Sequence, residues 1–166
     1  MRSKGPIVLS GALLAFFVFV ATGSPQEATS GVSGVDAIAA RQASLDMSSI
    51  TFRSMGDAMK AGGEAKSEGY PAAALAKWAR ALPRMFPVGT GQGETSAETQ
   101  ARPEIWRDRA GFERAATNYA NQTARLAALA AANDTAGFTK QLDLVNQACA
   151  ICHGRYKAGD QGPPRK

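Results

Sequence analysis

The sequence predicts an all-α protein, an antiparallel four-helix bundle. Alanine is abundant and β-branched residues are sparse beyond the N-terminus, a composition that favours helix. Apolar residues recur at intervals of three, four and seven, as on amphipathic helices, and the connections between these segments are mostly short. No alternating pattern of any strength predicts a strand or hairpin. A length of 166 residues corresponds to about one domain.

Residues 1–23 have the pattern of a secretory signal peptide. Arg2 and Lys4 precede an uninterrupted apolar run over residues 7–21, and small residues follow it. The run is shorter than the about 20 residues that span a bilayer comfortably, so cleavage near Gly23 is expected, with an uncleaved N-terminal anchor as the alternative. We therefore expect a periplasmic protein that has no stable membrane anchor after signal cleavage.

The charge of the mature chain does not indicate a nucleic-acid partner. Loss of the two basic residues of the leader lowers the net charge from +5 to +3. No basic cluster with interleaved aromatic residues accompanies this mild excess, so no nucleic-acid binding is expected.

The bundle is predicted to occupy residues 36–158. Before it, the polar and glycine/serine-rich residues 24–35 are expected to form a flexible lead. The first helix carries an apolar residue every seven positions, and the pair Gly62-Gly63 ends it. The members of this stripe are Ile38, Leu45, Phe52 and Met59.

The second helix is predicted to begin at Tyr70-Pro71, because proline is favoured in the first turn of a helix. Pro83 and Pro87 close it. Residues 88–101 then predict a loop that is long enough to suggest a function. The inner face of the second helix consists of Leu75, Trp78 and Leu82.

The third helix is predicted to start at Pro103, and Asn133-Asp134 separates it from the fourth. Residues 159–166, a basic segment that contains Gly-Pro-Pro, are expected to form a disordered tail. In the third helix, the apolar residues that recur every seven positions are Ile105, Phe112, Tyr119 and Leu126. In the fourth, the inward positions are Phe138, Leu142, Val145, Cys149 and Cys152, which places both cysteines on the buried face.

Both cysteines and the only histidine lie within five residues, as Cys149-x-x-Cys152-His153. This is the attachment pattern of a c-type haem. On a helix the three side chains share a face, so each thiol can form a thioether to a haem vinyl group and the imidazole can bind iron from the proximal side. The alternatives are weaker: a zinc site normally needs four ligands, a thioredoxin-like pair needs a βαβ setting, and a disulfide across so small a loop stabilises little.

The ligand on the other side of the iron cannot be a second histidine. Methionine is the remaining common protein ligand, although each methionine could equally be a core residue. Met47 is about 200° around the helix from Leu45, so if Leu45 faces the iron, Met47 points elsewhere and the iron is five-coordinate. The methionines of the mature chain are Met47, Met55, Met59 and Met85.

At this point the chain resembles the class II cytochromes c, and specifically cytochrome c′. The stretches that carry the resemblance are RQASL at 41–45, ARPEIW at 101–106 and CAICHGRYK at 149–157, within a similarity that covers residues 36–158. The resemblance implies one haem c covalently attached to Cys149 and Cys152, near the C-terminal helix of the bundle, with His153 as the axial iron ligand.

The resemblance also implies roles for residues of the first helix. Arg41 and Gln42 match a polar pair beside the haem propionates, and an arginine fork pairs well with carboxylates. The alternative for Arg41 is an ordinary solvated helix charge. Leu45 matches the residue that shields the distal face, where low-spin relatives place a methionine ligand.

Three further positions are implied to lie close to the haem. Phe86 resembles an aromatic residue that lines the pocket, although the neighbouring tryptophan of the family is missing. Gln100 precedes ARPEIW, near where relatives offer a polar haem contact. Lys157, four residues after the histidine, occupies a position on the proximal side where the family more often has arginine.

The implied function is a high-spin c-type haem protein that binds diatomic gases, nitric oxide and carbon monoxide, at five-coordinate iron. Electron transfer with a periplasmic redox partner and a homodimer formed through the first two helices are further implications. The alternative is a low-spin class II cytochrome c, an electron carrier with His/Met ligation. Neither is a conventional enzyme, because the only histidine is committed to iron and no catalytic triad or carboxylate pair can be assembled.

Overall fold

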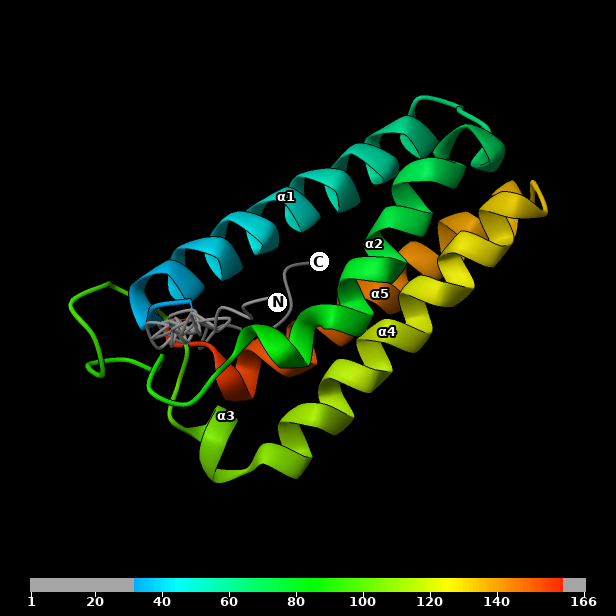
Figure 1. The fold of residues 1–166 in the computed structure, drawn as a ribbon. Helices are drawn as coiled ribbons and strands as arrows, with labels where there is room; N and C mark the ends of the chain where they lie inside the picture. The colour runs from blue at the N-terminus through cyan, green and yellow to red at the C-terminus, as the bar shows by residue number, and fades with distance from the viewer. Residues whose placement is uncertain (1–31, 160–166) are drawn as a thin grey trace, which may run out of the picture. The chain divides into compact units, whose positions relative to one another are not determined.

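The computed structural model describes residues 32–159, which form a bundle of helices (Figure 1). The helices are α1 (Gly34–Lys60), α2 (Gly69–Ala81), α3 (Glu104–Arg107), α4 (Arg109–Ala131) and α5 (Thr135–Tyr156). Two 3₁₀ turns, η1 (Ala65–Glu68) and η2 (Leu82–Met85), flank α2. Since α3 is a single turn, the four long helices confirm the predicted bundle. The predicted signal peptide, most of the flexible lead and nearly all of the tail lie outside the described residues.

The ends of α1 follow from local chemistry. The Ser33 hydroxyl accepts a hydrogen bond from the backbone N–H of Asp36 at 3.1 Å, which caps the first turn. The helix therefore starts two residues before the predicted bundle boundary. At the other end Gly62 has φ 82°, a left-handed conformation that glycine adopts without strain and that stops the helix where the sequence predicts.

The third predicted helix is interrupted at Asp108, so the prediction of one continuous helix from Pro103 is wrong. Asp108 leaves the helical conformation, and its carboxylate accepts a hydrogen bond from the backbone N–H of Gly111 at 3.1 Å, which caps α4. The hydroxyl of Tyr156 donates to the same carboxylate at 3.0 Å, and Arg155 pairs with it at 2.9 Å. The hydrogen bond from Tyr156 is the main cause that lowers the pKa of Asp108. A contact from α5 thus fixes the break.

The far end of the bundle is closed by the turn between α4 and α5. Asp134 caps α5 by accepting a hydrogen bond from the backbone N–H of Gly137 at 2.8 Å. Asn133 and Thr135 accept hydrogen bonds from the backbone of η1 at 2.9 and 3.1 Å. The connection from α1 to α2 is therefore held against the α4–α5 turn.

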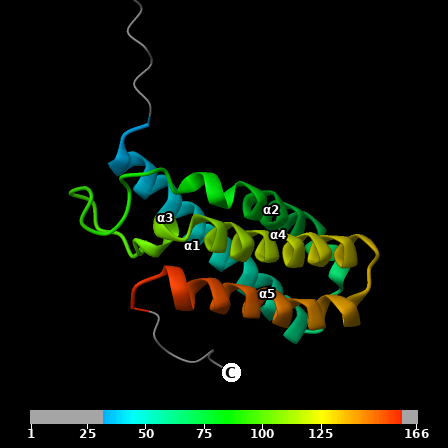
Figure 2. The same ribbon diagram turned by 90° about the horizontal axis from the view of Figure 1, so that it is seen from below.

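The packing of the four long helices is uneven. Figure 2 shows α4 between α2 and α5, and these pairs make the most extensive contacts in the bundle. By contrast, α1 contacts α5 at few positions. A main core cluster runs through α1, α2, α4 and α5, and a second, smaller cluster contains Ala101, Ile105, Phe112 and Tyr156. The seam between α1 and α5 is consequently the least closely packed part of the bundle.

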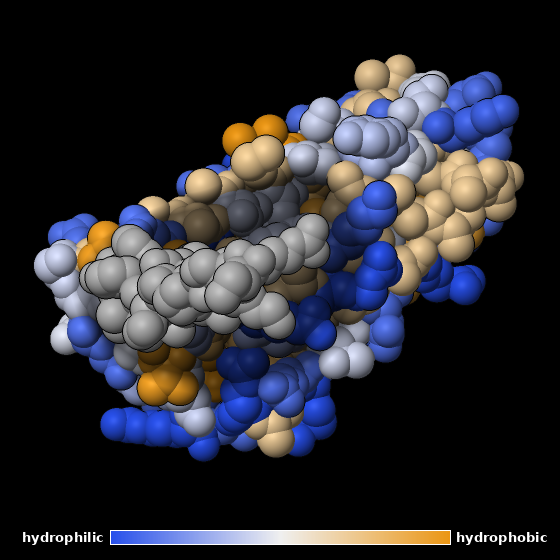
Figure 3. All heavy atoms as spheres, in the orientation of Figure 1, coloured by the Kyte–Doolittle hydropathy of each residue, from blue (hydrophilic) through white to orange (hydrophobic). Residues whose placement is uncertain are grey.

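The surface of the bundle mixes hydrophilic and apolar side chains, as the face in Figure 3 shows. None of the helices within residues 32–159 is long and apolar enough to cross a membrane.

Candidate functional site

The cysteine and histidine side chains of the motif lie near the C-terminal end of α5, where the two core clusters meet. Cys149 packs against the main cluster and Cys152 against the second cluster, while Phe86 packs against both. Cys149, Cys152 and His153 are all partly buried, whereas Ile151 between them is 65% exposed. The helix therefore turns the thiols and the imidazole inward together, and both thiols are free.

The surroundings of the two thiols are poorly solvated. Burial raises the pKa of the Cys149 thiol to about 11, because the charged thiolate loses hydration. Burial also raises the pKa of the Cys152 thiol to about 11, with a further contribution from the neighbouring Cys149. Both thiols are consequently neutral at pH 7 in the haem-free chain, and the pocket around them has a low local dielectric.

The haem-free chain should react slowly with iodoacetamide at neutral pH, because the thiolate is the nucleophile. Below pH 11 the alkylation rate of Cys149 and Cys152 should rise about tenfold per pH unit, as the thiolate fraction does. Mass spectrometry of quenched samples measures both rates. The same chain in urea is the control, and its rate should level off near a pKa of about 8.5. A folded chain that levels off there too would show that the thiols are not desolvated.

Arg41 is buried, with only 1% of its surface exposed, so the interpretation of a solvated helix charge is wrong. Its Nη1 donates to the carbonyl of Met85 at 3.3 Å and to Thr90 Oγ1 at 2.9 Å. Its Nη2 donates to the carbonyl of Thr90 at 3.0 Å and to Thr99 Oγ1 at 2.9 Å. The guanidinium also lies 4.5 Å from the ring centroid of Phe86, and burial lowers its pKa. Arg41 therefore anchors the loop over residues 88–101 to α1.

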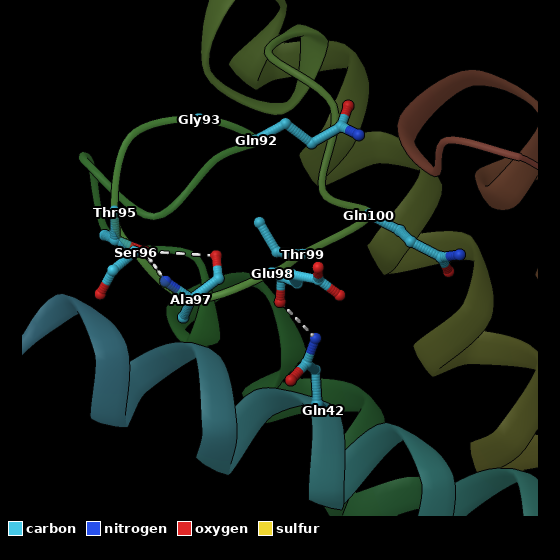
Figure 4. A pocket seen from close by; sticks show the side chains of 9 residues that line it. All are labelled: Gln42, Gln92, Gly93, Thr95, Ser96, Ala97, Glu98, Thr99 and Gln100. Atoms are coloured by element: carbon cyan, nitrogen blue, oxygen red, sulfur yellow. Dashed lines mark hydrogen bonds between the residues drawn. The ribbon is translucent and has the colours of Figure 1, made fainter.

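Gln42 contacts the same loop from the exposed side of α1. Its Nε2 donates to the carbonyl of Glu98 at 2.9 Å, beside an open hollow of about 570 Å³ (Figure 4). Gln100, the other predicted residue of this hollow, is exposed and points away from the Gln42 contact in Figure 4. The loop thus lies over α1, and Gln42 contacts it at Glu98, away from Gln100.

The end of the loop is joined to the end of α5. Ala101 and Lys157 form an isolated antiparallel bridge, and the backbone N–H of Ala158 donates to the carbonyl of Gln100 at 2.8 Å. We call this pairing of residues 100–102 with 156–158 the C-terminal clasp. It brings two predicted site residues, Gln100 and Lys157, to the same end of α5, where the carbonyl of His153 accepts a hydrogen bond from the backbone N–H of Lys157 at 3.1 Å.

Leu45 and Met47 lie on different sides of α1, as the helical angle predicts. Leu45 is partly buried and packs against the main cluster, which Cys149 also contacts. Met47 is 68% exposed. Met55 is fully buried in the core and Met59 packs near Gly63 at the far end of α1. Met47 therefore points away from the main cluster that Leu45 and Cys149 contact.

Trp78 lies in the same surroundings, although its sequence pattern predicts only a position on the inner face of the second helix. It packs against the main cluster, as do Leu45 and Cys149, and its indole N–H is buried. Within residues 32–159 it is the one buried side-chain donor or acceptor without a hydrogen-bond partner. Its amphipathic spacing predicts burial, but nothing in the sequence indicates that the N–H lacks an acceptor.

These residues fit a haem with carboxylate groups. The α5 motif supplies two thiols and an imidazole, and Leu45 and Phe86 supply apolar surface. Arg41 is a buried cation that pairs with no carboxylate in the described part of the chain, and Trp78 has an unused donor. A haem carboxylate would give the buried Arg41 the negative partner that it lacks, since buried charges are normally paired. No group of three or more metal-ligating side chains of residues 32–159 is placed to hold a metal ion alone.

Comparison with known proteins agrees with these features. A family model described as Cytochrome C' matches residues 36–157. The cytochrome c' of Rhodospirillum rubrum is 32% identical over 87 residues, which are 52% of this chain and 57% of that protein. The cytochrome c' of Rubrivivax gelatinosus is 33% identical over 72 residues, which are 43% and 54% of the two chains. The matches thus span somewhat more than half the length of these relatives.

Solved structures show the same fold. The crystal structure of cytochrome c' from Rubrivivax gelatinosus has a TM-score of 0.67 at 25% identity, over 75% of this chain and 96% of that one. A ferrous variant of cytochrome c prime from Alcaligenes xylosoxidans with bound NO has a TM-score of 0.67 at 27% identity, over 75% and 95%. The chain therefore belongs to the cytochrome c′ family and carries a covalently attached c-type haem.

Proposed function

We propose that this protein is a high-spin haem protein of the periplasm that binds nitric oxide and carbon monoxide at five-coordinate iron. The observation that carries the proposal is the side of α1 turned toward the motif, where Leu45 packs inward and Met47 points outward. Structures of Alcaligenes xylosoxidans cytochrome c prime with bound NO are among the similar ones, which supports gas binding.

The residues of α5 hold the cofactor in this proposal. Cys149 and Cys152 would hold the haem through two thioether bonds, and His153 would bind its iron. When bound, the haem supplies the iron that holds the gas. Gln100 and Lys157 lie at the C-terminal clasp and keep the end of α5 in place on this side.

The residues of α1 and its loop form the other side of the proposed pocket. Arg41 and Gln42 lie on the propionate side, where Arg41 supplies a buried positive charge and both hold the loop over α1. Phe86 packs against both core clusters and lines the pocket. Leu45 covers the distal face, and it offers no hydrogen bond of its own to a ligand.

The absorption spectrum of the reduced protein, with and without carbon monoxide or nitric oxide, tests this function. A broad, high-spin α/β region that changes on addition of either gas supports it. Sharp, resolved α and β bands that do not respond to gas would contradict it, and they would favour the low-spin electron carrier with His/Met ligation.

Replacing Leu45 by alanine should open the distal face. The association rate and affinity for carbon monoxide should rise about tenfold, if the leucine contributes ~1.4 kcal/mol of steric barrier. Flash photolysis of the carbon monoxide complex measures the rate. Met47→Ala, on the exposed side of the same helix, is the matched control and should change nothing. Unchanged binding in the Leu45 variant would rule out this residue as the gate.

The remaining parts of the proposal concern assembly and location. Met47 and Ile50 expose apolar surface on α1, which supports a homodimer formed through the first two helices. Sedimentation equilibrium measures the oligomeric state.

Export to the periplasm rests on residues 1–23, and N-terminal sequencing of the mature protein checks the cleavage near Gly23. Electron transfer with a periplasmic redox partner is a second activity of the same haem, and we propose no enzymatic turnover.

A further inference from the structure

A surface hollow of about 520 Å³ lies where η2 and the start of the following loop meet α3 and α4. Two prolines, Val88, Phe86 and Trp106 give it an apolar lining, and Val88 is 87% exposed. Of the described residues that line the hollow, only Arg84 and Arg109 are charged. The hollow therefore combines apolar surface with positive charge, and none of its lining residues is acidic.

The two arginines differ in how much of their charge is compensated. Arg84 is exposed and forms no ion pair within residues 32–159. Arg109 donates to the carbonyl of Pro83 at 2.8 Å, which holds its side chain at the hollow. It also pairs with Glu113 at 2.8 Å, one turn further along α4, which offsets part of its charge. Arg84 is consequently the main uncompensated charge of the hollow.

Phe86 connects the hollow with the candidate site. It lines the hollow and also packs against both core clusters, of which Cys149 contacts one and Cys152 the other. Its ring centroid lies 5.0 Å from that of Phe112, a buried member of the second cluster. The indole N–H of Trp106 donates to the carbonyl of Phe86 at 3.2 Å, which fixes this wall of the hollow. Phe86 therefore belongs both to the surface and to the packed region around the two thiols.

These properties match what a transient electron-transfer complex requires. Electron transfer slows steeply with distance, so a partner must dock where the surface leads to the haem surroundings. Such complexes are small, and complementary charge brings the partners together quickly. The net charge expected for the mature chain is only +3, so a local group of arginines orients a partner better than the whole molecule does.

We propose that this hollow is the docking surface for an acidic electron-transfer protein, whose carboxylates pair with Arg84 and Arg109 around an apolar contact at Val88 and Phe86. The inference rests on the electron transfer that the proposed function includes. In the complex one electron passes from the reduced partner to the ferric haem iron, which becomes ferrous. The partner is oxidised by one electron, and no covalent bond forms or breaks.

The test uses a reduced plant-type ferredoxin, an acidic one-electron donor, with the ferric haem protein. Anaerobic stopped-flow absorption measures the second-order rate of haem reduction. At about 0.1 M salt, Arg84→Glu should lower this rate about fivefold, because a change of two charges acts within about one Debye length of the partner. Val88→Asp should lower the rate about twofold, since it adds one negative charge to the same hollow. The rate of the unchanged protein should fall as salt rises to about 0.5 M, and that of Arg84→Glu should fall less.

Arg125→Glu is the matched control, since it makes the same change in net charge at an exposed position on α4. It lies about 24 Å further along this helix than Arg109, more than two Debye lengths at this salt, and should leave the rate unchanged. An unchanged rate in Arg84→Glu, or equal slowing in Arg125→Glu, overturns the inference but leaves the proposed electron transfer standing. If ferredoxin does not reduce the unchanged protein at any salt concentration, both the inference and the proposed electron transfer fail.

Discussion

A chain with both Cys149→Ala and Cys152→Ala should retain no haem after denaturation, a complete loss of the covalent cofactor. The physical reason is that thioether bonds survive unfolding, whereas bonds from His153 and packing contacts do not. A denaturing gel stained for haem, together with the intact mass, measures the loss. Each single variant should keep one thioether and therefore remain stained.

Ile151→Ala is the matched control for this experiment, because Ile151 lies between the two cysteines on α5 and is exposed. It should stain as strongly as the unchanged protein. Haem that stays attached to the double cysteine variant would show that another side chain holds it, and would remove the central assignment of the site.

Replacement of Arg41 by leucine should destabilise the haem protein by about 3 kcal/mol. The change removes three hydrogen bonds to Thr90 and Thr99 of the loop and one to the carbonyl of Met85, and a hydrogen bond from a charged donor is worth about 1.5–3 kcal/mol. Lost solvation of the buried charge offsets part of this sum. Urea unfolding measures the stability, and limited proteolysis should locate the new cleavage within residues 88–101.

Arg125→Leu is a suitable control, since Arg125 is exposed on α4 and such surface changes stay within about 0.5 kcal/mol. Equal losses in the two variants, or cleavage of the Arg41 variant outside the loop, would contradict its assignment as the loop anchor. Arg41→Lys should restore little, because an ammonium group cannot reproduce the planar fork.

The helices could be predicted from the sequence because their causes are local. The step of seven from Ile105 to Leu126 persists through the break between α3 and α4, so the periodicity predicts the correct buried face but not the break. Asp108 interrupts the helix while its carboxylate is held by Tyr156, which lies 48 residues away. The sequence pattern of a single segment therefore cannot predict that contact.

The candidate site likewise has one part that a local sequence motif predicts and another that depends on contacts between distant segments. The spacing of Cys149, Cys152 and His153 is a local motif, and α5 brings the three together as a helix must. The burial of Arg41 depends on Thr90 and Thr99, which lie 49 and 58 residues further along the chain. The buried and unpaired indole N–H of Trp78 likewise follows from packing between helices.

The different spans of these contacts have a consequence for the order of folding. Only residues 132–134 join α4 to α5, so this hairpin closes at a small entropic cost. The bonds from Arg41 close much longer segments, and α1 contacts α5 at few positions. We expect α1 to dock last, which pulse-labelled amide exchange measures as late protection of its N–H groups. The cysteine motif would then lie on a formed hairpin that is open on the side that α1 later covers.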